Sequence, residues 1–186
     1  MDIIRHLVNH GYNLTKKQIY SMTKDNPELA HDKFIVISKR LNSLAFDKIL
    51  FDNNLNKSNL PFELSNAAGF NKNGDIPPQF LEYLGFNRIV VGTVTNDLWL
   101  GNPIPRMIRY PETKSLVNWM GLPGIGAKRV AENLESFRKS TIPITINLMG
   151  TPGKIGDELL LDLEGTITLT LPYATRFELN ISCPNT

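Results

Sequence analysis

Short apolar segments alternate with longer helical segments from Phe62 to the end of the chain. The apolar segments FELSNA, RIVVGTV, ITINLM and FELNIS occupy residues 62–67, 88–94, 144–149 and 177–182 of 186. The segment between Ala127 and Arg138 has the apolar spacing of a helix. Strands that alternate with helices in this way predict a parallel sheet whose connections are crossover helices. The sequence therefore predicts an α/β fold.

Polar or glycine-rich motifs end three of these expected strands. The motifs are NAAGFNKNG, VGTVTN and NISCPNT, which begin at Asn66, Val91 and Asn180. In an α/β barrel, the carboxyl ends of the parallel strands meet at one face and build the active site there. We therefore expect a barrel whose site is made from these motifs. A barrel of this type takes about 250 residues, so residues 62–186 can supply only about half of one.

The N-terminal part of the chain has a different pattern. Apolar residues recur at helical spacing up to residue 45, and Asp25 or Asn26 can cap a helix that begins at Pro27. An Asn- and Asp-rich stretch follows. The predicted organisation is a helical N-terminal extension at residues 1–45, a linker at residues 46–61 and the first half of an α/β barrel at residues 62–186.

One segment fits two structures. Gly165–Leu171 has β-branched residues in alternation, which is typical of a strand. The same region also carries apolar residues at helical spacing, and a barrel needs a helix before FELNIS. Pro172 is awkward inside such a helix. We favour the helix.

Composition and charge exclude several classes of protein. A hydrophobic content of 41% argues against disorder, and a net charge of +2 argues against a nucleic-acid partner. Cys183 is the single cysteine, so an intrachain disulfide or a cysteine-based zinc site is impossible, and we expect no metal. No apolar run approaches the ~20 residues of a spanning helix, and no signal peptide is evident. We expect a cytoplasmic protein that at most lies on the cytoplasmic membrane surface.

The motif from Asn66 to Gly74 combines small residues with one amine. Small residues at a strand end let a flat ring or a phosphate approach the backbone closely. The amine of Lys72 can then meet an anionic substrate or a cofactor. A glycine-rich turn with a solvated lysine explains the same residues without any ligand.

Three further motifs carry hydrogen-bonding groups. They are the hydroxyls of Gly92–Thr95, the amide of Asn118 in NWMGLP and the amide of Asn147 in INLMG. Threonines at strand ends and amides in loops are common without a ligand. An inward amide in a barrel core needs a partner, so Asn147 is the stronger candidate for a ligand contact.

The stretch from Asn180 to Thr186 places two amides around a thiol. Asn180 and Asn185 could clamp a ring that has both donors and acceptors, with Cys183 above it as a general base or nucleophile. Lone cysteines are also often buried and inert. The residues alone leave both interpretations of Cys183 open.

In this order the motifs resemble those of the dihydroorotate dehydrogenase family. NAAGFNKNG, VGTVT, GNPIPRM, NWMGLP, INLMG and NISCPNT match that family's successive motifs over nearly all of residues 62–186. NPELAH and its following helix resemble the N-terminal extension of the membrane-associated, quinone-using class. The resemblance implies a (β/α)8 TIM barrel that holds FMN and oxidises dihydroorotate to orotate in pyrimidine synthesis.

The resemblance also implies roles for individual residues. Cys183 falls on the catalytic base, which removes a proton from ring carbon 5 while hydride leaves carbon 6 for flavin nitrogen 5. The implied FMN contacts are Ala68, Gly69, Phe70, Asn71, Lys72, Thr93, Asn147 and Asn180. The implied substrate contacts are Lys72, Asn118, Trp119, Met120, Gly121, Leu122, Asn180 and Asn185.

The electron acceptor stays open between two classes of the family. The quinone-using class typically has a serine as the base and a Phe-Asn pair after its NRMG motif. This chain has Cys183 and Leu122-Pro123, which resemble the soluble class that reduces fumarate or a nicotinamide cofactor. The N-terminal extension and the first motif, NAAGFNKNG, favour a quinone, and the base and the NWMGLP motif favour the other acceptors.

The family's second flavin lysine, phosphate-binding loops and a further substrate asparagine would all lie beyond Thr186. We therefore expect the C-terminal half of the barrel as a separate chain, or as a fragment lost by cleavage after Thr186. Two alternatives remain: another FMN barrel that acts on a dihydropyrimidine or dihydrouridine, and a non-catalytic module that keeps the fold. A nearly balanced charge disfavours work on RNA.

Overall fold

The computed structural model describes residues 21, 23, 26–43, 61–110 and 112–183. The chain forms two compact units, which we treat separately. The N-terminal unit contains Met1–Leu55 and Pro103–Trp119, and the sheet unit contains Asn56–Asn102 and Met120–Thr186. The polar motifs expected to bind a ligand lie mostly in the sheet unit.

The sheet unit is built on parallel strands in chain order. Strands β1 (Ile89–Val94), β4 (Ile144–Leu148) and β5 (Arg176–Leu179) form one sheet in the order β1-β4-β5. Ser65 makes a parallel bridge to Arg88, the residue before β1, and Asn71 makes one to Val91 within β1. The four segments predicted as strands therefore run side by side in sequence order, as in part of a TIM barrel. The predicted α/β fold is confirmed.

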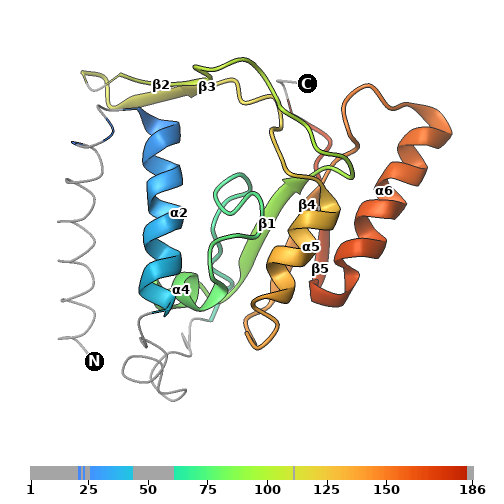
Figure 1. Ribbon diagram of the computed structural model, residues 1–186, viewed down its shortest axis with the longest axis horizontal. Helices are drawn as coiled ribbons and strands as arrows, with labels where there is room; N and C mark the ends of the chain where they lie inside the picture. Colours follow the sequence, from blue (N-terminus) through green and yellow to red (C-terminus); the bar gives the residue numbers. More distant parts are fainter. Residues whose placement is uncertain (1–20, 22, 24–25, 44–60, 111, 184–186) are drawn as a thin grey trace. The chain divides into compact units, whose positions relative to one another are not determined.

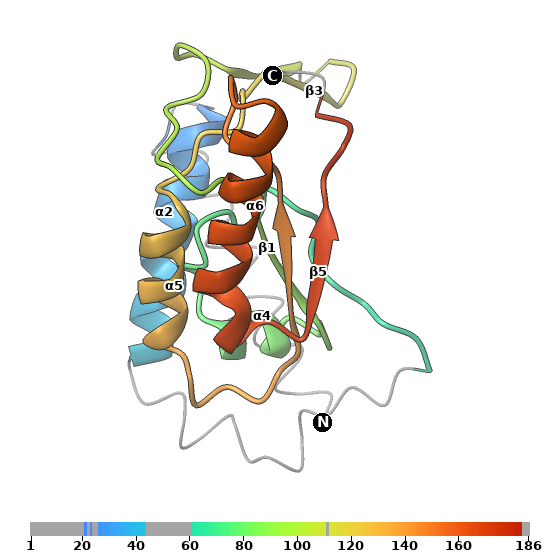
Figure 2. The ribbon, with the colours of Figure 1, turned by 90° about the vertical axis from the view of Figure 1, so that its right-hand side faces the viewer.

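Helices connect these strands and cover one face of the sheet. Helix α4 (Pro78–Tyr83) precedes β1, α5 (Ala127–Glu135) leads into β4, and α6 (Gly156–Thr170) with the 3-10 turn η1 (Leu171–Tyr173) leads into β5. Helices α5 and α6 lie side by side on the sheet (Figures 1 and 2). Helix α5 buries Ala127, Val130 and Leu134 at helical spacing, and β1 and β4 are buried along their whole length.

The segment that fitted two structures is helical. Gly165–Leu171 falls in the last turns of α6 and in η1, and Pro172 lies within η1. The hydroxyl of Thr166 donates to the carbonyl of Asp162 (3.1 Å), and that of Thr170 donates to the carbonyl of Thr166 (2.7 Å). Buried threonines in a helix satisfy their hydroxyls in this way, so β-branched residues need not form a strand.

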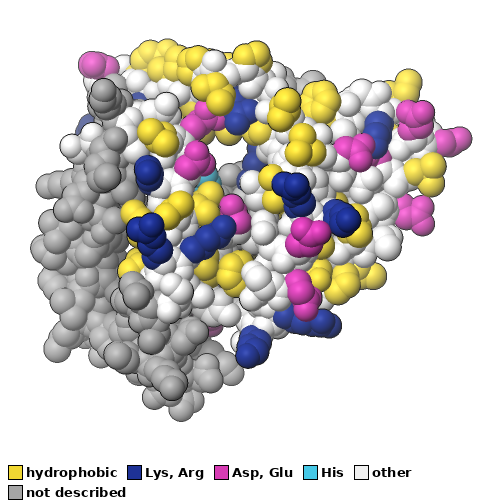
Figure 3. Space-filling model, in the orientation of Figure 1, with side chains coloured by type: hydrophobic (Ala, Val, Ile, Leu, Met, Phe, Trp, Pro, Cys, Tyr) yellow, Lys and Arg dark blue, Asp and Glu magenta, His cyan; other side chains and the backbone are white. Residues whose placement is uncertain are grey.

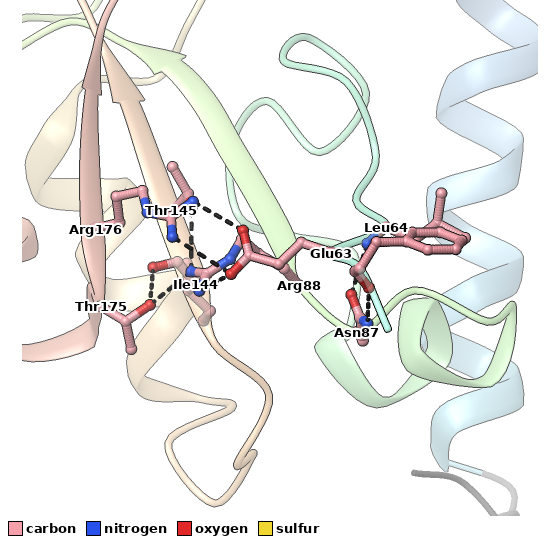
Figure 4. A network of polar contacts seen from close by, with 9 residues as sticks. Glu63, Leu64, Asn87, Arg88, Ile144, Thr145, Thr175 and Arg176 are labelled. Carbon is pink, nitrogen blue, oxygen red and sulfur yellow. Dashed lines mark hydrogen bonds and ion pairs between the residues drawn. The ribbon is translucent and has the colours of Figure 1, made fainter. Parts of the chain in front are cut away.

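Charged side chains tie the amino ends of the strands together (Figure 4). The carboxylate of Glu63 accepts hydrogen bonds from Arg88 (2.8 Å) and Arg176 (2.9 Å). Arg88 also donates to the hydroxyl of Thr175 (3.0 Å). This network lies opposite the end of the sheet where the polar motifs gather, so its role is in stability.

The N-terminal unit pairs a helix with a hairpin. Helix α2 spans Pro27–Ser43, and strands β2 (Met107–Tyr110) and β3 (Ser115–Asn118) form an antiparallel ladder. The side chain of Asn26 accepts from the N–H of Leu29 (3.1 Å), which confirms the predicted cap. The hairpin was not predicted. The expected first helix, before residue 21, and the linker at residues 46–61, apart from Pro61, lie outside the described residues.

Within the described ranges, no helix is long and apolar enough to cross a membrane.

Candidate active site

Three predicted ligand residues meet at the carboxyl ends of β1, β4 and β5. The hydroxyl of Thr93 donates to the carbonyl oxygen of the Asn147 side chain (2.5 Å). The amide NH2 of Asn180 donates to the same threonine oxygen (3.0 Å). Thr93 and Asn147 are buried, and Asn180 is half-buried. Side chains more than 30 positions apart thus form one polar cluster, as a barrel site requires.

An irregularity in β1 brings Thr93 to Asn147. The pairing of β1 with β4 shifts between Val91 and Val94, so that two residues of β1 face one residue of β4. Gly92 has a φ of +119°, and a Cβ there would run into the backbone oxygen of Asn147. Only glycine fits such a conformation and such a close approach. The peptide bond between Gly92 and Thr93 is cis.

Glu178 joins this cluster and was missed from the sequence. Its carboxylate accepts a hydrogen bond from the side-chain NH2 of Asn147 (2.8 Å). The two residues are direct partners in the β4–β5 register. The available signal was the spacing of Glu178 and Asn180, because alternate residues of a strand lie on one face.

The first motif offers open backbone at a strand end. Ala68 and Gly69 are exposed, and the N–H of Gly69 donates to the carbonyl of Gly92 (2.5 Å). Gly69 has a φ of +92°, and a Cβ there would meet no atom within 4 Å. Phe70 and Lys72 follow and are half-buried. A planar ligand therefore has room to approach this backbone.

Asn71 holds the loop that carries Lys72. Its side chain is fully buried, accepts from the N–H of Ile76 (3.1 Å) and donates to the Ile76 carbonyl (3.3 Å). The carbonyl of Asn71 accepts from the N–H of Gly92 (3.2 Å). The amide of Asn71 thus stabilises the loop, and its predicted cofactor contact remains a prediction.

Asn66 has a structural role that the sequence did not reveal. Its side-chain NH2 donates to the carbonyl of Val90 (2.7 Å), and its side-chain oxygen accepts from the N–H of Val90 (3.0 Å). Both backbone groups of Val90 are thus satisfied by one amide. This pairing attaches the first motif to β1.

The residues of the NWMGLP motif, Asn118 to Pro123, belong to two different units. Asn118 ends β3 and is exposed, and Trp119 follows it in the N-terminal unit. Met120, Gly121 and Leu122 belong to the sheet unit. Gly121 and Leu122 both have positive φ, at +68° and +57°. For leucine this conformation is unusual, and such backbone conformations are frequent at functional sites.

The loop after β5 carries the predicted base. The N–H of Ser182 donates to the side-chain oxygen of Asn180 (3.2 Å), which holds the turn that leads to Cys183. Cys183 is half-buried and not in a disulfide. Asn185 lies outside the described residues.

A second polar cluster locks the loops after β1 and β4 and was also missed. The buried carboxylate of Asp162 accepts from the N–H and the hydroxyl of Thr151 (2.8 and 3.0 Å), and from Lys154. Lys154 also binds Asp97. Hydrogen bonds from the ammonium to Asp162 first, and to Asp97 second, raise the pKa of Lys154 to about 12. Lys154 therefore stays charged and holds the loops that follow β1 and β4 together.

The sequence model of the dihydroorotate dehydrogenase family matches residues 51–186. The chain is 38% identical over 126 residues to a dihydroorotate dehydrogenase (quinone) of Corynebacterium diphtheriae, covering 68% of this chain and 34% of that protein. It is 37% identical over 120 residues to one of Natronomonas pharaonis, covering 64% and 34%. The chain therefore spans about a third of the length of these curated relatives.

Solved structures give the same result for the fold. A dihydroorotate dehydrogenase of Eimeria tenella in complex with ferulenol matches with a TM-score of 0.66 and 23% identity, over 87% of this chain and 45% of that chain. The ligand-free form from the same organism matches with a TM-score of 0.56 and 27% identity, over 67% and 35%. The α/β architecture is thus that of part of a barrel.

Proposed function

Because the chain belongs to the dihydroorotate dehydrogenase family, as its motifs predicted, we propose that it forms part of an enzyme that oxidises dihydroorotate to orotate with FMN. The observation that carries this proposal is the cluster of Thr93, Asn147 and Asn180 at the carboxyl ends of three parallel strands. Family motifs that the sequence spreads over 88 positions supply one set of donors and acceptors there. The activity is proposed for the completed barrel.

The residues of the sheet unit fit a flat cofactor. Exposed backbone at Ala68 and Gly69 leaves room for a ring, and the neighbouring amides of Asn147 and Asn180 can donate to ring acceptors. Lys72, in the adjoining loop, adds a cation suited to an anionic or carbonyl-rich edge. FMN, when bound, supplies the hydride acceptor. Its predicted contacts are Ala68, Gly69, Phe70, Asn71, Lys72, Thr93, Asn147 and Asn180.

The substrate step needs a base and an oriented ring. We assign the base to Cys183, which removes the proton from carbon 5 of dihydroorotate as hydride leaves carbon 6. The bond between Asn180 and Ser182 holds the turn before Cys183, which supports a fixed position for the thiol. The predicted substrate contacts are Lys72, Asn118, Trp119, Met120, Gly121, Leu122, Asn180 and Asn185.

The names of the relatives support a quinone as electron acceptor. Cys183 and Leu122 instead support fumarate or a nicotinamide cofactor, as in the soluble class. With a quinone acceptor, the extension at residues 1–45 would lie at the cytoplasmic face of the membrane. We propose residues 46–61 as its linker to the half-barrel of residues 62–186.

The proposal includes a C-terminal half of the barrel as a partner. In the part of the chain that the structure describes, β5 pairs with β4 alone, and Leu179 on it is 56% exposed. A further parallel strand on that edge would cover such apolar groups and pair the open backbone. A separate chain or a fragment can supply it.

The test is a spectrum and a turnover assay on the purified protein together with whatever polypeptide completes the barrel. FMN bound to protein absorbs at about 370 and about 450 nm. Anaerobic dihydroorotate should bleach the band at about 450 nm and yield orotate in equal amount. Reoxidation by a quinone analogue, fumarate or NAD then identifies the acceptor.

Two results would replace the proposal with its alternatives. Flavin that is bleached by a dihydropyrimidine or dihydrouridine, and not by dihydroorotate, would indicate another FMN barrel. A protein that binds no flavin and shows the mass of the 186-residue chain alone would indicate a non-catalytic module. Figure 3 shows acidic and basic side chains interspersed over α5 and α6, which disfavours an RNA substrate.

A variant of Lys72 separates binding from folding. Lys72→Ala in the completed enzyme should cut turnover severely and leave the melting temperature within a few degrees. Lys128→Ala, an exposed lysine on α5, is the matched control and should change neither. Turnover equal to wild type in Lys72→Ala would show that the first motif is assigned wrongly.

A further inference from the structure

We propose that Glu178 is a positioning residue that sets the orientation of the Asn147 amide, and thereby which groups this cluster offers to a ligand. The inference rests on the proposed function only for the identity of that ligand. Its structural basis is a chain of four hydrogen bonds from Glu178 through Asn147, Thr93 and Asn180 to the N–H of Ser182.

The two ends of this chain have fixed polarity. A carboxylate oxygen only accepts, so Asn147 must turn its NH2 toward Glu178 and its carbonyl toward Thr93. A backbone N–H only donates, so Asn180 must turn its carbonyl toward Ser182 and its NH2 toward Thr93. The single hydroxyl hydrogen of Thr93 then goes to Asn147, and its oxygen accepts from Asn180. One arrangement satisfies every member.

Among the described residues, Glu178 is the acceptor that fixes the Asn147 side of this arrangement. Asn147 is 2% exposed with Glu178 in place, and a leucine at position 178 would cover its NH2 without accepting a hydrogen bond. A rotated amide would present NH2 to Thr93 and leave the hydroxyl hydrogen of Thr93 without its acceptor. Removing Glu178 therefore leaves a buried donor without a partner or breaks the bond between Asn147 and Thr93.

The register of the sheet explains why this residue is a glutamate on β5. Glu178 is the direct partner of Asn147 across the β4–β5 ladder, and alternation puts it on the same face as Asn180. Within the described residues Glu178 makes no ion pair, and its carboxylate accepts a hydrogen bond from the Asn147 amide.

The arrangement selects a class of ligand edge. Each amide NH2 has two hydrogens, and the chain uses one from Asn147 and one from Asn180. Asn180 is half-buried, so a ligand can approach its second N–H. The cluster therefore favours a planar ring whose edge carries carbonyl or imine acceptors over one whose edge carries donors. Glu178 maintains that preference without touching the ligand.

The experiment measures two quantities in the completed protein: the affinity for FMN by fluorescence titration, and the side-chain NH2 resonances of Asn147 and Asn180 by NMR. Glu178→Leu should weaken FMN binding about tenfold or more, because a buried donor loses its partner. It should also shift both side-chain resonances. Glu178→Gln keeps an acceptor oxygen and should stay within about threefold of wild type. Glu132→Gln, on the exposed face of α5, should change nothing.

A double-mutant cycle distinguishes positioning from a separate contribution. If Glu178 acts through Asn147, adding Glu178→Leu to Asn147→Ala should weaken FMN binding no further than Asn147→Ala alone. Additive losses, or unshifted side-chain resonances in Glu178→Leu, would overturn the inference. Glu178→Gln as weak as Glu178→Leu would also overturn it, since charge and not acceptance would then matter. A wild type that binds no FMN refutes the proposed function, and the resonances still decide the role of Glu178.

Discussion

Arg176 binds the carboxylate of Glu63, which lies 113 positions earlier in the chain, at 2.9 Å. Glu63 lies in the first predicted strand segment of the sheet unit and Arg176 begins β5, so their bond spans β1 and β4, which lie between them. Arg88, on one of the segments between, binds the same carboxylate at 2.8 Å. One glutamate thus gathers the amino ends of the parallel segments.

The stability that Glu63 contributes should depend on pH. Hydrogen bonds from Arg88 first, and from Arg176 second, hold the pKa of Glu63 below its ordinary value of 4.5. A carboxyl whose pKa is lowered by folding stabilises the protein at pH values above its ordinary pKa. This stabilisation is lost as the pH falls through the lower pKa of the folded state. Glu63→Gln should therefore lower the urea midpoint at pH 7, and the difference from wild type should shrink below about pH 4.5. A difference that is constant from pH 7 to pH 3 would contradict this.

The buried carboxylate of Asp162 should be the most sensitive group of the loop cluster. Asp162→Ala leaves the N–H of Thr151 and the ammonium of Lys154 without their buried partner. We expect a loss of about 3 kcal/mol in the free energy of unfolding, measured by urea denaturation. Glu164→Ala, on the exposed side of the same helix, should change it by less than about 0.5 kcal/mol. Equal losses in the two variants would show that Asp162 is not the centre of the cluster.

Two glycines with positive φ should respond differently to alanine. At Gly92 a Cβ would collide with the backbone of Asn147 and would lie 2.9 Å from the nitrogen of Val94, whereas at Gly153 it would meet nothing within 4 Å. Gly153→Ala should cost about 1 kcal/mol, from backbone conformation alone. Gly92→Ala should cost about 3 kcal/mol or more, because β1 must also move away from β4. Thermal melts of both variants check this, and similar melting temperatures would refute the close approach.

Cys183 should control the first chemical step if the proposed function is right. Cys183→Ala in the completed enzyme should slow flavin reduction by dihydroorotate by orders of magnitude in a stopped-flow experiment, with orotate binding largely kept. A thiol loses its proton much more readily than a hydroxyl, so Cys183→Ser should keep part of the activity with its pH profile moved upward. Rapid reduction in Cys183→Ala would mean that the thiol only fills space.

Local patterns were enough to predict the order of the parallel segments and the start of α2. Short apolar segments that end in small or polar residues indicate strands, and Asn26 followed by Pro27 indicates the start of a helix. Both patterns depend on neighbouring residues only. The helix before β5 was harder, because threonines at positions such as 166 and 170 have strand propensity. It could be inferred because a parallel sheet needs a crossover there.

The roles of Glu178, Asn66 and Asp162 could not be predicted, since each depends on a partner far away in the chain. A glutamate in a strand usually indicates a solvated face, and only the β4–β5 register places this one opposite Asn147. The hairpin of β2 and β3 was also missed. Its strands have only four residues each, so the alternation of apolar and polar side chains is short. The proline-rich segment before β2 also argues against a strand there.

The N–H of Asn102 donates to the carbonyl of Met120 at 3.0 Å, although 17 residues lie between them. The backbone that leaves the sheet unit after Asn102 therefore returns to it at nearly the same point. An insertion whose two ends meet in this way behaves as a cassette: its sequence and length can change in evolution, or be exchanged by an engineer, without altering the spacing between β1 and α5. Residues 103–117 can thus diversify while the proposed substrate contacts Asn118 and Trp119, and the strands that carry Thr93 and Asn147, stay as they are.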